Sequence, residues 1–138
     1  MRFNATYNYA ILPDLEVEYE GDVGIDLPIP ETNAIPAHGA RRINHCFSVE
    51  LPNSSCGLVA MLSIVPRSST LFRHGLIVVP GAVDSNYTGD LKTQVYNPTD
   101  EDVFLGRGEK ISQGIIHWVQ ALPSKGDERE SKGFGSTG

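Results

Sequence analysis

Residues 76–97 read LIVVPGAVDSNYTGDLKTQVYN, a stretch in which short apolar runs alternate with turn residues. Leu76–Val79 is an apolar run ended by a Pro-Gly pair, and Leu91–Asn97 begins with Leu, Thr and Val at every second position. Alternation with a period of two is typical of a β-strand with one buried face. Because small and turn-forming residues fill the segment between the runs, we expect Gly81–Asp90 to pair with Leu91–Asn97 as a β-hairpin.

Similar short runs occur along most of the chain. They are Phe47–Leu51, Leu58–Val65, Val103–Leu105, Ile111 and Ile115–Val119. Leu58–Val65 is nearly continuously apolar, which predicts a strand buried on both faces. Many short strands separated by turns indicate an all-β sandwich, jelly roll or barrel. Ser68–Gly75 predicts the one short helix, because hydroxyl residues suited to an N-cap begin it and a glycine ends it.

The composition limits the kinds of protein that this chain can be. Its 138 residues are 40% hydrophobic, which suits one domain with a packed core. The net charge of −6 argues against stable nucleic-acid binding, which needs a broad basic face. We find neither a signal-peptide core nor the roughly 20 apolar residues of a membrane span. Cys46 and Cys56 lack metal-site spacing, so we expect free thiols in a cytoplasmic protein.

The end of the chain differs from the rest. Residues 123–132 carry several charges and no large apolar side chain, and Gly133–Gly138 contains only Phe134 as an aromatic residue. We therefore expect a folded β domain over 1–122 and a flexible arm over 123–138. Glycines on both sides of Phe134 would leave its ring accessible, as an arm that closes over a ligand requires.

Pro66-Arg67-Ser68-Ser69 is a candidate anion site. A planar guanidinium matches phosphate oxygens, and serine hydroxyls add hydrogen-bond donors. From these residues alone, a capped helix with a surface arginine explains the motif better, because such tetrapeptides are common.

Three further motifs combine turns with single polar residues. In Gly81–Asp90, Asp84 is placed to act as a general base, although an ordinary Asp-Ser-Asn turn also fits. Gly24-Ile25-Asp26-Leu27 sets one acid between apolar residues, where a carboxylate needs a partner or a metal, or else marks a strand end. Gln113, after the turn at Arg107–Gly108, is either a ligand-binding amide or an edge-strand glutamine.

Taken together and in this order, these motifs resemble those of the trimeric dUTPase family. The resemblance extends from Gly24 to Gly138 and rests on five segments: Val23–Leu27, Pro66–Ser69, Gly81–Asp90, Arg107–Gln113 and Arg129–Gly138. It implies a jelly-roll-like distorted β-barrel that forms homotrimers with active sites shared between subunits. It also implies hydrolysis of dUTP to dUMP and pyrophosphate with Mg²⁺, which limits uracil in DNA and supplies dUMP.

The resemblance also implies a role for each matching residue. Asp84 would activate the water that attacks the α-phosphorus, and Asp26 would contact Mg²⁺ through water. The residues implied to bind substrate are Arg67, Ser68, Ser69, Gly81, Ala82, Val83, Tyr87, Lys92, Gln113, Arg129, Phe134, Gly135, Ser136 and Thr137. Among them, Tyr87 would lie under the deoxyribose and Phe134 would stack on uracil.

Several alternatives stay open from the sequence. A dCTP deaminase shares the family's fold, but Asp84, Tyr87 and the tail with Phe134 follow the dUTPase pattern. A regulator that binds dUTP and a protein partner would keep the same motifs. A plain β-sandwich interaction module would leave the tail unexplained. Glu130 and Lys132 depart from the small residues common in the family's tail, and a glutamate beside phosphates weakens their binding.

Overall fold

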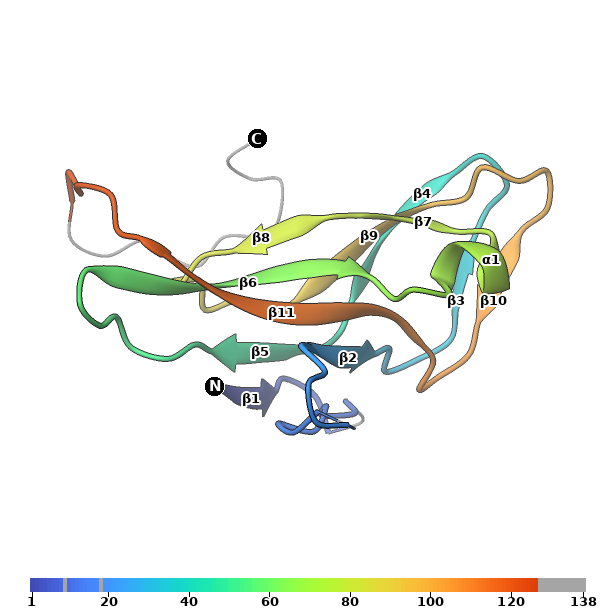
Figure 1. The fold of residues 1–138 in the computed structure, drawn as a ribbon. Helices are drawn as coiled ribbons and strands as arrows, with labels where there is room; N and C mark the ends of the chain where they lie inside the picture. Colours follow the sequence, from blue (N-terminus) through green and yellow to red (C-terminus); the bar gives the residue numbers. More distant parts are fainter. Residues whose placement is uncertain (9, 18, 127–138) are drawn as a thin grey trace.

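We describe a computed structural model in which residues 1–8, 10–17 and 19–126 are placed (Figure 1). Within these residues the chain forms eleven β-strands and one short α-helix, which confirms the all-β prediction. The elements are β1 (Arg2–Ala5), β2 (Gly24–Pro28), β3 (Asn33–Ile35), β4 (Ala40–Asn44), β5 (Phe47–Glu50), β6 (Leu58–Pro66), α1 (Thr70–His74), β7 (Ile77–Val79), β8 (Gly81–Val83), β9 (Lys92–Tyr96), β10 (Val103–Leu105) and β11 (Lys110–Gln120).

Two antiparallel sheets form the body of the molecule. One has the strand order β2-β11-β6-β8 and the other β4-β9-β7, while β1 pairs with β5 and β3 pairs with β10. Figure 1 shows the long strands β6 and β11 side by side along one face, with β4 and β9 behind them. Because β11 lies between β2 and β6, residues far apart in the sequence become neighbours on one sheet.

The core consists of two hydrophobic clusters. The first contains Phe3, Leu27, Phe47, Val49, Leu62, Ile64, Val83 and Leu91, and the second contains Ile29, Ile35, Ile43, Leu76, Val78, Val95, Leu105 and Ile111. The expectation that β6 is buried on both faces is wrong. Its side chains alternate between buried and partly exposed, because only one face of this sheet packs on the core.

The predicted β-hairpin is also wrong. β8 pairs with β6, whereas β9 pairs with β4 and β7, so the segment between β8 and β9 crosses from one sheet to the other. Val83 and Leu91 stand at the two ends of this connecting segment, and both are fully buried in the first hydrophobic cluster. Apolar–polar alternation gives the buried face of a strand but not its partner.

The predicted helix is confirmed in a shorter form. Gly75 ends α1 in the left-handed conformation with φ 70°, and Ser69 stands at the N-cap without a side-chain cap hydrogen bond. Cys46 is buried and Cys56 is exposed, and the two do not form a disulfide with each other. The described residues contain no helix that is long and apolar enough to cross a membrane. The predicted arm lies mostly outside the described residues, so the boundary at 122 stays a prediction.

Candidate active site

Three strands bring Asp26, Arg67 and Gln113 together. Asp26 on β2 lies directly opposite Gln113 on β11, and Arg67 follows the last residue of β6, the strand on the other side of β11. Arg67 forms an ion pair with Asp26, with Nε 2.9 Å from Oδ1, and the two side chains are 34% and 32% exposed. An ion pair at this depth is screened by solvent, so its cation stays available to an incoming anion.

Main-chain carbonyls fix the orientation of these side chains. Arg67 Nη1 donates to Lys110 O at 3.1 Å, and Arg67 N donates to Ile111 O at 3.3 Å. Gln113 Nε2 donates to Pro66 O at 3.1 Å. We call Asp26, Arg67 and Gln113 the phosphate wall, because an arginine and an amide held in place suit a phosphate chain.

Gly24 makes room for the phosphate wall. A Cβ atom at this position would lie 1.9 Å from Gln113 Oε1, so the glutamine side chain occupies the space that any other residue would fill. The sequence motif pointed to Asp26 but gave no reason for this glycine. A glycine inside a strand often marks a close approach of other atoms, and that signal could have found it.

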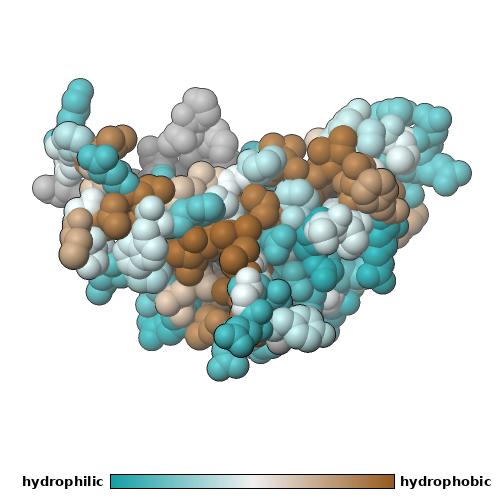
Figure 2. All heavy atoms as spheres, in the orientation of Figure 1, coloured by the Kyte–Doolittle hydropathy of each residue, from teal (hydrophilic) through white to brown (hydrophobic). Residues whose placement is uncertain are grey.

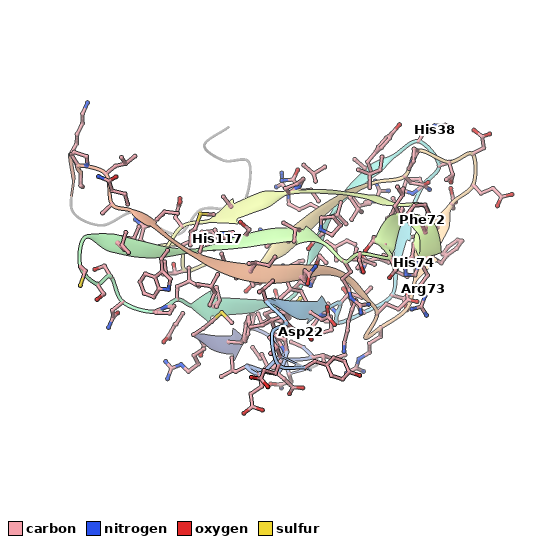
Figure 3. The ribbon with its side chains drawn as sticks, viewed as in Figure 1. Asp22, His38, Phe72, Arg73, His74 and His117 are labelled. Atoms are coloured by element: carbon pink, nitrogen blue, oxygen red, sulfur yellow. The ribbon has the colours of Figure 1, made fainter. Side chains whose placement is uncertain are left out.

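The phosphate wall lines a groove of about 1180 Å³. Ser68 lies in the same groove, and its other side is formed by the segment Ile11–Val23, which contributes several acidic side chains. Figure 3 labels one of these acids, Asp22, next to β2. The groove therefore presents a guanidinium, an amide and a hydroxyl on one side and carboxylates on the other.

A second candidate region lies at β8 and the segment after it. Val83 is fully buried, Asp84 is exposed, and Tyr87 is partly buried against the first hydrophobic cluster. Tyr87 N donates to Asp84 O at 3.1 Å, and Tyr87 Oη donates to Asp90 O at 2.9 Å. These bonds close the turn and hold the tyrosine hydroxyl at the main chain of Asp90.

β8 occupies an edge of its sheet, because β6 is its only partner strand among the residues that the structure describes. The main chain of Gly81 and Ala82 is therefore accessible along one side, and their small side chains allow a flat ligand to approach it. Lys92, at the start of β9, is partly buried and pairs with Asn44. This region suits recognition of a planar base by backbone groups.

One chain does not bring the two regions together. Asp84 follows Val83, which pairs with Leu62, whereas Arg67 lies five residues further along β6. Five residues of strand span about 17 Å. The two regions therefore lie well apart along β6 in one chain.

The remaining predicted site residues divide into two groups. Ser68 and Ser69 are exposed beside Arg67, as the anion site requires. The others are outside the described residues: Arg129, Phe134, Gly135, Ser136 and Thr137. Their roles stay predictions.

The antiparallel sheets and the arginine-lined groove define an all-β protein with a polar groove at the end of one sheet. Comparison with known proteins identifies the family, since the dUTPase family model matches residues 11–138. A deoxyuridine 5'-triphosphate nucleotidohydrolase of Paramecium bursaria Chlorella virus 1 is 33% identical and covers 86% of this chain and 85% of its own. The corresponding protein of Mesorhizobium japonicum is 35% identical over 92% of this chain and 83% of its own. This chain belongs to the dUTPase family.

Solved structures agree on the fold. A mutant dUTPase of the Staphylococcus aureus phage phi11, described as coordinating a structural Mg(II) ion, superposes with a TM-score of 0.76. It is 18% identical and covers 93% of this chain and 96% of its own. The dUTPase of Staphylococcus bacteriophage 80alpha with dUPNHPP gives 0.74 at 22% identity, over 99% of this chain and 97% of its own. At these identities the likeness concerns the fold, and it confirms the dUTPase-like architecture.

Proposed function

We propose that Asp84 activates the water that attacks the α-phosphorus in the hydrolysis of dUTP to dUMP and pyrophosphate, the reaction of this family. The observation that carries the proposal is the exposed carboxylate of Asp84 in the turn after β8, a turn closed by the bond from Tyr87 N to Asp84 O. An exposed carboxylate in an ordered turn is suited to orient a water and accept its proton. The leaving group is pyrophosphate, whose charge Arg67 offsets and whose oxygens accept hydrogen bonds from the hydroxyls of Ser68 and Ser69.

Recognition of the deoxyuridine is assigned to β8 and Tyr87. The open edge of β8 offers backbone donors and acceptors from Gly81, Ala82 and Val83 to the edge of uracil. The Tyr87 ring, held through its Oη, lies flat under a deoxyribose and leaves little space for a 2′-hydroxyl. Lys92, at the start of β9, adds a cation for the same substrate. This arrangement predicts selection for the base and for the sugar.

Magnesium fits the phosphate wall as a partner of the substrate. Mg²⁺ usually takes one or two carboxylates, several waters and the phosphates of its nucleotide. Asp26 supplies one partly exposed carboxylate there, and we assign it a contact through water. In the described residues no three His, Cys, Asp or Glu side chains form a metal cage, and Figure 3 shows His38 and His74 far from His117. When bound, the ion neutralises phosphate charge, while Arg67 and Gln113 orient the chain.

We further propose that each active site combines Asp84 of one subunit with the phosphate wall of another, in a homotrimer. The separation of about 17 Å along β6 supports this. Exposed apolar side chains support it too, since Figure 2 shows them along β6 and β11 and again around β7 and α1. Among them Phe72 is 90% exposed, and Ile77 and Trp118 are about half exposed, as expected of surfaces that another subunit covers.

The arm 123–138 would close over the site with Phe134 on the uracil and Arg129, Gly135, Ser136 and Thr137 on the phosphates. A charged arm that excludes water strengthens each contact beneath it. Two cysteines that do not form a disulfide with each other fit a reducing compartment, and we assign the protein to the cytoplasm, or to that of a host cell.

The direct test is pyrophosphate release from dUTP, dTTP, dCTP and UTP. We expect dUTP to be hydrolysed far faster than the other three, with no ammonia released from dCTP. Asp84→Asn should keep dUTP binding and lose about 10²–10⁴-fold in turnover, the usual contribution of a general base. Equal rates on dUTP and UTP, or near-normal turnover by Asp84→Asn, would refute the assignment.

A further inference from the structure

Three buried polar side chains cross the core between the two sheets. His45 Nδ1 lies 2.9 Å from Pro28 O, His45 Nε2 lies 2.7 Å from Thr93 Oγ1, and Thr93 Oγ1 lies 2.8 Å from Ser112 Oγ. All three side chains are fully buried. None of them was singled out by the sequence motifs, and the reaction described above does not use them.

The hydrogen bonds of this buried chain have one consistent direction. A carbonyl oxygen only accepts, so His45 Nδ1 carries the proton and donates to Pro28 O. His45 Nε2 then accepts from the Thr93 hydroxyl, whose oxygen accepts from Ser112. Burial lowers the pKa of His45 to about 4, which keeps the ring in the neutral form that this pattern requires. A buried network in which every group is satisfied holds its strands in one arrangement.

The network lies at the seam between the two hydrophobic clusters. On β9, Thr93 stands between Leu91 of the first cluster and Val95 of the second. Its two ends reach strands that carry the phosphate wall, because Pro28 ends β2 and Ser112 directly precedes Gln113 on β11.

A β-bulge occurs in β11 next to Ser112. Lys110 pairs with Pro28 but Ser112 pairs with Leu27, so Ile111 is the extra residue. Ile111 and Ser112 are consecutive and both fully buried, which a regular strand with alternating faces does not allow. The bulge thereby turns Gln113 toward the groove. A slip by one residue would turn it to the opposite face.

The bulge also supplies the carbonyls that hold Arg67. Lys110 O accepts from Arg67 Nη1, and Ile111 O accepts from Arg67 N and, at 2.7 Å, from Thr70 Oγ1. The position of the bulge therefore determines where both Arg67 and Gln113 point.

We propose that His45, Thr93 and Ser112 are positioning residues, which fix the bulge at Ile111 and so hold Arg67 and Gln113 for phosphate binding. The role in hydrolysis rests on the function proposed above, whereas the role in fixing the bulge does not. The network acts only through the phosphate wall and touches no reacting atom.

The test is Thr93→Val, which keeps the shape of the side chain and removes the central hydroxyl. We expect exchange of the Arg67 backbone amide to become about tenfold faster, because its bond to Ile111 O depends on the bulge. We also expect kcat/KM for dUTP to fall about tenfold or more, mainly through KM, since misplaced binding groups lose affinity. Thr93→Ser, which keeps the hydroxyl, should restore both values.

The matched control is Val49→Ala, which removes buried apolar volume from the first cluster, away from Ile111. This variant should lower the melting temperature at least as much as Thr93→Val does. It should change neither the exchange of the Arg67 amide nor kcat/KM for dUTP. If both variants change exchange and kinetics alike, the network is merely structural and the proposal is wrong.

Should Thr93→Val not fold, Ser112→Ala must shift both the amide exchange and kcat/KM in the direction expected for Thr93→Val. Unchanged values would overturn the proposal. A wild type inactive on dUTP would refute the proposed function, while amide exchange would still decide the role of the network.

Discussion

At the scale of single residues, the contact between Gly24 and Gln113 makes a specific prediction. Gly24→Ala places a Cβ where Gln113 Oε1 lies, so the flexible glutamine side chain must move away from the phosphate wall. The backbone itself accepts alanine, and the free energy of unfolding should change by less than about 1 kcal/mol. We expect KM for dUTP to rise while the melting temperature is kept. An unchanged KM would show that the position of Gln113 does not matter for binding.

The buried ring of His45 predicts how stability depends on pH. Its pKa is lowered from 6.5 to about 4 by burial, so the unfolded chain binds this proton more readily than the folded one. The contribution of the neutral His45 ring to the free energy of unfolding is therefore fully present above pH 6.5. It is lost as the pH falls from about 6.5 to about 4, and the whole loss is about 3 kcal/mol.

Urea unfolding at a series of pH values measures this effect. His45→Gln should be less stable at pH 7 and show a flatter profile between pH 6.5 and 4. A variant whose profile keeps the slope of the wild type would place the acid sensitivity in other groups.

At the scale of elements, much could be predicted from the sequence. The runs at 47–51, 58–65 and 103–105 became strands, since short apolar or alternating runs between turn residues are typical of strands. The pairing of β8 and β9 with different partners could not be predicted, because local alternation does not encode which strand is adjacent. The bulge at Ile111 and the His45 network were missed for the same reason, as both arise only when distant strands pack.

The candidate site, too, could be predicted in part: its side chains were found from the sequence, but the contacts that support them were not. Arg67, Asp26 and Gln113 were recognised one by one from their motifs, and the structure brings them together. Their supports are a backbone carbonyl of Pro66, a bulge and the bare surface of Gly24. These supports depend on register across three strands, which short motifs do not contain.

The arm is the element whose role is most easily isolated. Removal of Gly133–Gly138 should lower kcat/KM for dUTP strongly and leave the melting temperature nearly unchanged, because the strands of the body end at Gln120. Loss of the Phe134 ring alone is expected to cost about 1–3 kcal/mol of binding, as base–aromatic stacking does. Phe134→Ala should therefore be intermediate and Phe134→Trp near wild type. A truncated enzyme with full activity would show that the arm has no role in binding or catalysis.

At the scale of the whole molecule, the exposed apolar side chains and the divided site both predict an assembly. Light scattering should give roughly three times 15.0 kDa at the concentrations used for assays. The apolar surfaces at Phe72 and Trp118 would then be covered. A fully active monomer would contradict the shared site.

The most direct measurement is complementation between two inactive variants. Asp84→Asn and Arg67→Ala should each hydrolyse dUTP poorly alone. After unfolding and refolding together, a site that takes Asp84 from one subunit and Arg67 from another is intact in about a quarter of random combinations. We therefore predict recovery of about a quarter of the wild-type rate of pyrophosphate release. If mixed trimers are present and no activity returns, each site lies within a single chain and the account is wrong.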